Sequence, residues 1–293
     1  MSRLFSFASS ALFTLFILFH SINCQAETIK VAVASNFLST TKALKSQFKI
    51  LNPQHNIKII SASTGQLSHQ ILNGAPFDLF LAANKQHPQH IHSTLNLPDN
   101  SLFHYATGKL VLVSHKTINT LSTSKLDLKN LSTLYNNKQR ELINDIINQS
   151  KTVAIANHKL APYGLASKEV LTSLNLLNSL KGKTITGQNI SQTHQFFSSK
   201  NADTAFISKS QLIDAGFLHT DNNPAYKTVL NIKENLHKPI EQWAVKLTQS
   251  AANTAFINYL ASNSAQGVIR GQGYSLPFNS DTGYGTSKTS LVP

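Results

Sequence analysis

The sequence is poor in sulfur, in tryptophan and in acidic side chains. Its 293 residues include one cysteine, one methionine and one tryptophan. A single cysteine excludes a disulfide within the chain, so a hydrophobic core must hold the fold together. Hydrophobic residues make up 41% of the sequence, which is enough to bury the core of two domains.

Acidic residues number 13 against 26 basic ones, giving a formal net charge of +13. Nearly all the basic residues are lysines, because the arginines are limited to Arg3, Arg140 and Arg270. Proteins that read nucleic acid depend heavily on the arginine fork, and these lysines are scattered, so we expect no nucleic-acid partner. A diffuse positive surface instead favours the attraction of small anions.

Catalytic signatures are also missing. No G-x-S-x-G elbow occurs, and the few acidic residues leave few groups that could orient a catalytic base. An exported hydrolase is the enzyme alternative, but the sequence shows no activated nucleophile. We therefore expect no enzyme activity, no catalytic residue and no cofactor.

Long hydrophobic runs are confined to the first residues. After Arg3 comes "LFSFASSALFTLFILF", followed by "NCQA", in which Cys24 and Ala26 are small residues suited to a cleavage site. We predict a signal peptide over 1–26, cleavage after Ala26 and export to a periplasm. A lipidated Cys24 and an uncleaved anchor are alternatives. The last residues, 278–293, are polar and small, and we predict a mobile tail.

Apolar strand-like runs alternate with segments of helical spacing. Phe37, Thr41, Leu44 and Phe48, for example, would share one helix face. Such alternation predicts α/β architecture with mostly parallel sheets, and the number of strands favours two domains. The strand-like runs are "IKVAVAS", "NIKIISAS", "DLFLAAN", "KLVLVS", "TVAIAN" and "TAFIS".

Four strand-to-helix turns are rich in neutral hydrogen-bond donors and contain no acidic side chain. They hold Ser35 and Asn36, then Ser63 and Thr64 in "ISASTGQLSHQI", then Tyr163, and finally Ile190 with its neighbours. The first N–H groups of a helix have no intrahelical partner and carry partial positive charge, so converging helix starts would bind an anion. Helix capping alone also explains hydroxyls at these positions, and spacing does not show that the turns converge.

A histidine cluster offers a different site. "KQHPQHIH" contains His87, His90 and His92, and imidazole is a good zinc ligand. Pro88 at a helix start would put His90 and His92 on different faces, and no acidic partner lies nearby in the sequence. A zinc receptor using these three residues is therefore the less favoured alternative, and an exposed helix start is the simpler interpretation.

Eight segments together resemble the molybdate-binding periplasmic component of ABC transporters, which has the two-lobed class II periplasmic-binding-protein fold. They occur in that family's order and cover nearly all of residues 29–277: "VAVASNF", "SASTGQLSHQI", "NGAPFDLFLAAN", "YATGKLVLVS", "IANHKLAPYGLA", "GQNISQTHQFF", "KPIEQWAVKL" and "IRGQGYSLP".

The resemblance implies a molybdate or tungstate receptor that delivers its anion to a membrane permease. It implies discontinuous lobes: lobe one from 27–107 and 239–277, and lobe two from 108–238. The ligand-binding residues that it implies are Ser35, Asn36, Ser63, Thr64, Tyr163 and Ile190, the last through its backbone N–H. We also expect a monomer without a directly bound metal ion.

Three departures from the family pattern stand out. Thr64 replaces a common serine, Asn84 stands where an aspartate is usual, and "SKS" (208–210) replaces a more apolar run. The first concerns selectivity, and the other two look structural. Sulfate or phosphate in the same fold is the alternative ligand, and a receptor that kept the fold but lost its ligand stays open. A fully ionised oxyanion such as molybdate suits a site made of donors, whereas monohydrogen phosphate needs an acceptor.

Overall fold

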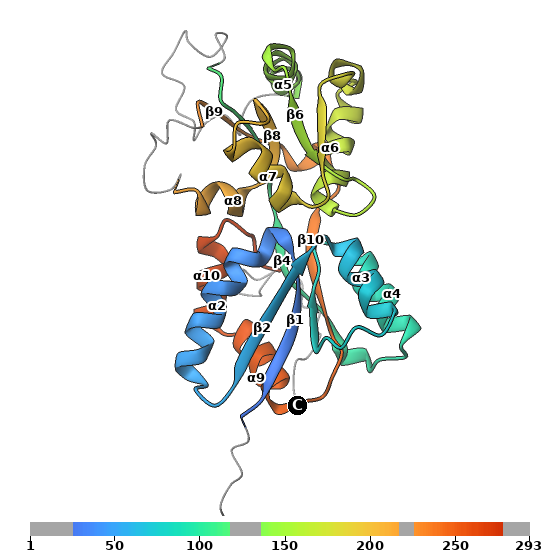
Figure 1. Ribbon diagram of the computed structural model, residues 1–293, viewed down its shortest axis with the longest axis vertical. Coiled ribbons are helices and arrows are strands. Elements are labelled where there is room, and N and C mark those ends of the chain that lie inside the picture. The colour runs from blue at the N-terminus through green and yellow to red at the C-terminus, as the bar shows by residue number, and fades with distance from the viewer. Residues whose placement is uncertain (1–25, 118–135, 217–225, 278–293) are drawn as a thin grey trace, which may run out of the picture.

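The computed structural model describes residues 26–117, 136–216 and 226–277. The predicted tail and all of the predicted signal peptide except Ala26 lie outside these ranges. The described chain forms two lobes stacked along the long axis of the molecule (Figure 1). Each lobe is built on one five-stranded sheet flanked by helices, which confirms the expected two-lobed α/β fold.

The sheet of lobe one brings together strands from both ends of the chain. Its order is β2 (Asn56–Ala62), β1 (Thr28–Ala34), β3 (Leu79–Leu81), β10 (Ile240–Lys246) and β4 (Leu102–Gly108). The sheet of lobe two has the order β7 (Thr184–Gly187), β6 (Val153–Ala156), β8 (Thr204–Ser208), β5 (Leu110–Ser114) and β9 (Thr228–Asn231).

Helices cover both faces of each sheet (Figure 1). Lobe one carries α2 (Leu38–Leu51), α3 (Thr64–Leu72), α4 (Gln86–Thr94), α9 (Ala251–Leu260) and α10 (Asn263–Gly271). Lobe two carries α5 (Asn136–Gln149), α6 (Pro162–Ser173), α7 (Ile190–Ser198) and α8 (Lys209–Asp214). Short 3-10 turns are η1 (Ser35–Phe37), η2 (Asp99–Ser101), η5 (Leu177–Leu180) and η6 (Glu234–Leu236).

Serine side chains begin four of these helices. The residues that precede α3, α8, α9 and α10 each accept a hydrogen bond from the backbone N–H three positions ahead; they are Ser63, Ser208, Ser250 and Ser262. This is the usual N-cap geometry, which satisfies a donor that has no partner inside the helix. Capping thus explains part of the abundance of serine before helices, in agreement with the capping interpretation of these hydroxyls given above.

The six strand-like runs of the sequence all form strands, and the predicted face of α2 is buried. Thr41, Leu44 and Phe48 are fully buried, and Phe37, in η1 just before the helix, joins the same core. Phe48 packs edge-on against Phe256 of α9, with ring centroids 5.2 Å apart. The helical spacing in the sequence was therefore a correct guide to the core of lobe one.

Four of the five strands in each sheet run in the same direction, which confirms the expectation of mostly parallel sheets, and one strand of each runs the opposite way. In lobe one, β1 pairs in parallel with β2 and β3, but β10 is antiparallel to β3 and β4. In lobe two, β6 pairs in parallel with β7 and β8, but β5 is antiparallel to β8 and β9. The reversed strands are β10 in lobe one and β5 in lobe two, and each adjoins a segment where the chain crosses between the lobes. Helical crossover connections produce only the parallel pairs.

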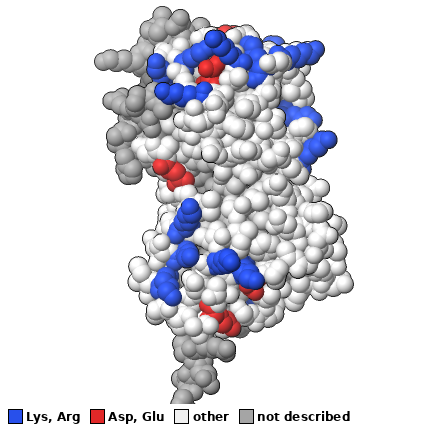
Figure 2. Space-filling model, viewed as in Figure 1, with Lys and Arg blue, Asp and Glu red and all other residues white. Residues whose placement is uncertain are grey.

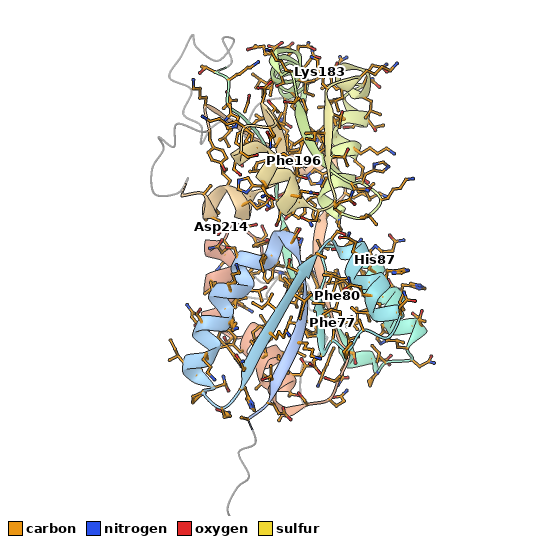
Figure 3. All side chains as sticks on the ribbon, in the orientation of Figure 1. Phe77, Phe80, His87, Lys183, Phe196 and Asp214 are labelled. Atoms are coloured by element: carbon orange, nitrogen blue, oxygen red, sulfur yellow. The ribbon has the colours of Figure 1, made fainter. Side chains whose placement is uncertain are left out.

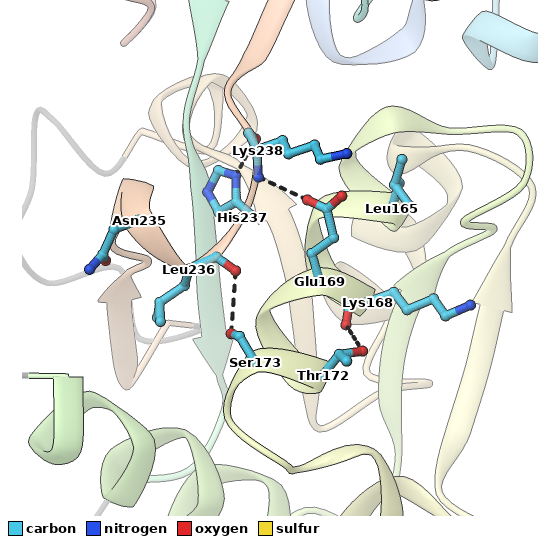
Figure 4. Close-up of a pocket in the computed structure, with 9 residues that line it drawn as sticks. All are labelled: Leu165, Lys168, Glu169, Thr172, Ser173, Asn235, Leu236, His237 and Lys238. Carbon is cyan, nitrogen blue, oxygen red and sulfur yellow. Dashed lines mark hydrogen bonds between the residues drawn. The ribbon is translucent and has the colours of Figure 1, made fainter.

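Two crossing segments join the lobes, from β4 to β5 and from β9 to β10. Lys109 in the first segment and Glu234 in the second form an ion pair at 3.7 Å. The second segment is also held to α6, because the Lys238 N–H donates to the Glu169 carboxylate at 2.9 Å and the Ser173 hydroxyl donates to the Leu236 carbonyl at 3.3 Å (Figure 4). Helix α6, which contains Tyr163 in its first turn, is thus anchored to the chain crossing.

On the face shown in Figure 2, charged side chains gather at the far end of lobe two and on one side of lobe one, and an acidic group lies beside a basic one at one edge of the lobe boundary. Across the described ranges, none of the helices combines the length and apolar character needed to span a membrane.

Candidate anion-binding site

The two donor-rich turns of lobe one lie side by side. Strands β1 and β2 are parallel neighbours, and their last residues, Ala34 and Ala62, are paired in register. The turns that follow them therefore leave the same edge of the sheet, which is where ligands of α/β proteins commonly bind. Ser35 and Thr64 in these turns are both buried.

The two turns of lobe two have the same arrangement. Strands β6 and β7 are parallel neighbours that end in register at Ala156 and Gly187. Tyr163 is the second residue of α6, and Ile190 is the first residue of α7. No side chain caps α6, so the first N–H groups of this helix keep their capacity to bind a ligand.

The four turns converge across the boundary between the lobes. The Ser191 hydroxyl, in the fourth turn, donates to the carbonyl of Ser35 in the first at 3.1 Å. The Gly65 N–H, in the second turn, donates to the carbonyl of Leu160 just before the third at 2.9 Å. A β-carbon at Gly65 would stand 3.1 Å from that carbonyl oxygen, so glycine permits this close approach. Tertiary structure thus supplies the convergence that the sequence left open.

The Thr64 hydroxyl is placed as a donor. Its oxygen accepts the Ala83 N–H at 3.1 Å, and Thr64 is 1% exposed. A hydroxyl that already accepts a hydrogen bond still has its proton to donate, and a buried proton of this kind needs an acceptor. An oxyanion would provide one.

The side chain of Tyr163 is buried and its hydroxyl group is unpaired. It is 1% exposed, and its hydroxyl has no hydrogen-bond partner within the described chain. Burial raises the pKa of Tyr163 well above its usual value, and the nearby hydroxyls of Tyr274 and Tyr105 raise that pKa further. Tyr274 and the Asn36 amide are close enough to influence this pKa, yet neither has hydrogen-bonding geometry to the Tyr163 oxygen. Tyr163 is therefore a neutral, buried, unpartnered donor.

The remaining predicted residues have structural partners. The Ser63 hydroxyl donates to the Gln66 side chain at 2.8 Å and accepts the Gln66 N–H, which makes it a helix cap. The Ile190 carbonyl accepts a hydrogen bond from the Gln211 side chain at 3.1 Å. The Ile190 N–H is the first N–H group of α7. Asn36 uses its amide nitrogen inside lobe one.

Asn36 reveals residues that sequence reasoning missed. Its amide nitrogen donates to Gln242 Oε1 at 2.9 Å and to Tyr274 Oη at 3.1 Å. Gln242 is fully buried in β10, and Tyr274 is 5% exposed beyond α10. Both lie in segments that resemble the family, "KPIEQWAVKL" and "IRGQGYSLP". The signal that could have identified them is a polar side chain within an otherwise apolar strand or core pattern.

A small polar cavity of about 160 Å³ adjoins the first and fourth turns. Its lining includes Ser35, Asn36 and Ser191 together with Lys42 and Asp214. Asp214 lies at the boundary between the lobes (Figure 3). Burial raises the pKa of Asp214, while a hydrogen bond from Ser39 and the charge of Lys42 oppose that rise.

The histidine cluster does not form a metal site. Within the described ranges, no group of three histidine, cysteine or acidic side chains is arranged to hold a metal ion. His87 and His90 line a cavity of about 570 Å³ beside α3, while the His92 ring contacts the Pro98 carbonyl at 3.1 Å. His87 lies on α4 (Figure 3). Burial, and then the charge of His90, lower the pKa of His87. Asn84 accepts the His87 N–H at 3.3 Å, a local role at the start of α4.

The chain is 35% identical over 255 residues to the molybdate-binding protein ModA of Azotobacter vinelandii, covering 86% of this chain and 91% of that protein. It is 31% identical over 252 residues to ModA of Rhodobacter capsulatus, covering 85% and 88%. The solved structure of the periplasmic molybdate-binding protein of Azotobacter vinelandii superposes with a TM-score of 0.70 at 30% identity, covering 85% of this chain and all of that one.

The family model of bacterial extracellular solute-binding proteins matches residues 29–275, which include both lobes and all four turns. The chain therefore belongs to the bacterial extracellular solute-binding protein family.

Proposed function

We propose that this protein captures molybdate between its two lobes and delivers it to the membrane permease of an ABC importer. The observation that carries the proposal is the convergence of four turns whose donors are all neutral, among them the unpartnered hydroxyl of Tyr163. The molybdate-binding relatives support the same ligand. They are transport proteins, and this protein acts in transport rather than catalysis.

The ligand-binding residues that we propose, counting those that shape the binding turns, are Ser35, Asn36, Ser63, Thr64, Tyr163 and Ile190. Thr64 and Tyr163 contribute hydroxyl protons, and the starts of α6 and α7 contribute N–H groups and the positive ends of their dipoles. Asn36 and Ser63 act mainly by holding the turns in shape, because their side chains are engaged in lobe one.

A site made of donors favours an oxyanion that carries no proton. Molybdate, tungstate and sulfate all satisfy this condition, whereas monohydrogen phosphate brings a proton that needs a buried acceptor. Cavity size then separates molybdate and tungstate from the smaller sulfate. We propose that tungstate binds with molybdate, that the protein works as a monomer, and that export is followed by cleavage after Ala26.

Thermal unfolding of the chain from Glu27 onward, stripped of ligand, tests the function. Molybdate at a hundred times its dissociation constant should add about 2.7 kcal/mol to the free energy of unfolding. We expect tungstate to act similarly, and sulfate, phosphate and zinc to have little effect. If sulfate or phosphate stabilised the protein and molybdate did not, that anion would be assigned as the ligand in place of molybdate. If zinc alone stabilised the protein, the anion site would be refuted.

Isosteric variants then test the individual contacts. Tyr163→Phe and Thr64→Val each remove one hydroxyl and should weaken molybdate binding by about tenfold to a hundredfold, because hydrogen bonds to charged groups contribute about 1.5–3 kcal/mol. Tyr259→Phe is the matched control: its hydroxyl bonds to Gln47 at 2.9 Å, away from the four turns. Unchanged affinity in Tyr163→Phe would remove Tyr163 from the site.

A further inference from the structure

Ser210 makes an unusual contact for a residue in the first turn of a helix. It lies in the "SKS" segment that departs from the family pattern, and it is 2% exposed. Ser208 caps the helix, with Gln211 completing the capping box. The Ser210 hydroxyl lies 2.9 Å from the Ser208 hydroxyl and also reaches across the lobe boundary, to 3.0 Å from the Asn36 carbonyl and 3.0 Å from the Tyr274 hydroxyl.

Asn36 is the centre of the resulting network. Its carbonyl accepts hydrogen bonds from Ser210 at 3.0 Å and from Tyr274 at 2.7 Å. Its amide nitrogen donates back to Tyr274 and also to Gln242. All four side chains are buried, so these hydrogen bonds are shielded from water. Buried networks whose members are all satisfied specify a single arrangement of the groups involved.

The neighbouring carbonyl is held in the same way. The Ser35 carbonyl accepts a hydrogen bond from the Ser191 hydroxyl of lobe two at 3.1 Å, just as the Asn36 carbonyl accepts one from the Ser210 hydroxyl. Both carbonyls of the first turn therefore point to hydroxyl donors of the opposite lobe. A carbonyl that turned toward an oxyanion would repel it, so the orientation of these two peptides matters for anion binding.

We propose that Ser210 is a positioning residue for anion binding: with Tyr274 it forms a latch that holds the Asn36 carbonyl when the lobes are closed. The latch joins α8 of lobe two to the first anion-binding turn of lobe one, so it exists only in the closed form. It slows release of the anion and fixes the direction of the turn's peptides. This inference rests on the proposed function.

The test measures molybdate association and dissociation rates for Ser210→Ala, Tyr274→Phe and the double variant. Ser210→Ala should release molybdate about threefold to tenfold faster with little change in association, because the lost hydrogen bond forms after the anion has entered. In the double variant, the rate of molybdate release should increase by less than the product of the increases in the two single variants, because both hydroxyls bind the same carbonyl.

Ser150→Ala is the matched control. Ser150 is 3% exposed, and its hydroxyl bonds to the Ile146 carbonyl and to Thr204, both at 2.6 Å and both within lobe two. This variant should lower the unfolding temperature but leave molybdate release unchanged. Release from Ser210→Ala at the wild-type rate, or independent effects of Ser210 and Tyr274, would overturn the latch.

Small-angle X-ray scattering separates failure of the latch from failure of the proposed function. Wild-type protein that binds no molybdate in calorimetry would contradict the function. The latch would still predict that ligand-free Ser210→Ala has a larger mean radius of gyration than the wild type, because its closed form is less stable. Equal radii would refute the latch.

Discussion

The backbone of Gly108 lies directly against the hydroxyl group of Tyr163. A β-carbon at Gly108 would stand 2.0 Å from Tyr163 Oη and 3.0 Å from Gln242 Nε2, closer than atoms can approach without a shift. Gly108 ends β4, where the chain leaves lobe one, and Tyr163 is the second residue of α6 in lobe two. The absence of a side chain at the crossing therefore determines where the proposed ligand-binding hydroxyl lies.

Gly108→Ala should displace the Tyr163 hydroxyl and weaken molybdate binding by about tenfold or more, the effect of losing one hydrogen bond to a charged group. Calorimetric titration measures the change. Gly267→Ala is the control, because a β-carbon there meets no atom within 4 Å. Wild-type affinity in Gly108→Ala would show that the position of the hydroxyl is not critical.

Ser63→Ala should affect stability more than binding. The Ser63 hydroxyl is engaged in a capping box with Gln66, and loss of an N-cap typically costs about 1 kcal/mol. Urea unfolding should show that loss, and molybdate affinity should change by less than the Thr64→Val variant changes it. A larger effect on affinity than that of Thr64→Val would make Ser63 a direct ligand contact.

Asp214→Asn should strengthen molybdate binding at neutral pH. Burial raises the pKa of Asp214 above its ordinary value of 3.8, so its charged form is disfavoured in the folded protein. The protonated Asp214 carboxyl group favours the folded state at low pH, and this contribution is lost as the pH rises through the pKa of the folded state. At neutral pH the charged carboxylate opposes both folding and the binding of a nearby anion.

Removing that charge should lower the dissociation constant by about twofold to fivefold in low salt, and less in high salt. Asp99→Asn is the charge-matched control, since Asp99 lies in η2 of lobe one, outside the cavity that Asp214 lines. Equal affinities of Asp214→Asn and Asp99→Asn would refute a local effect of Asp214.

Stability should fall steeply at alkaline pH. Burial raises the pKa values of Tyr105 and Tyr163 well above 10, so the folded protein keeps these protons at a pH where the unfolded chain releases them. Their contribution is complete below about pH 10 and is lost as the pH rises through the folded pKa. Urea midpoints measured from pH 8 to 11 should decline less steeply in Tyr105→Phe and Tyr163→Phe than in the wild type. Parallel curves would contradict this assignment.

The local sequence was sufficient for the elements and for their chemistry. Apolar runs identified six strands, and helical spacing identified the buried face of α2, because apolar side chains must face a core whatever their neighbours are. Donor-rich turns such as the one holding Thr64 were visible for the same reason: strand ends and helix starts are local features. Strands β4, β7, β9 and β10 were not among the predicted runs, since their burial depends on partners far away in the chain.

Tertiary structure alone decided which of these donors meet. The pairing of β1 with β2 and of β6 with β7 sets the turns in two pairs, and the lobe crossing then brings Ser191 to Ser35 and Ser210 to Asn36. Asn36 contacts Tyr274 across 238 positions of the chain. Sequence patterns carry information about neighbours a few residues apart. A hydrogen bond over such a separation depends on where two whole lobes come to rest, so sequence could propose an anion site but not its network.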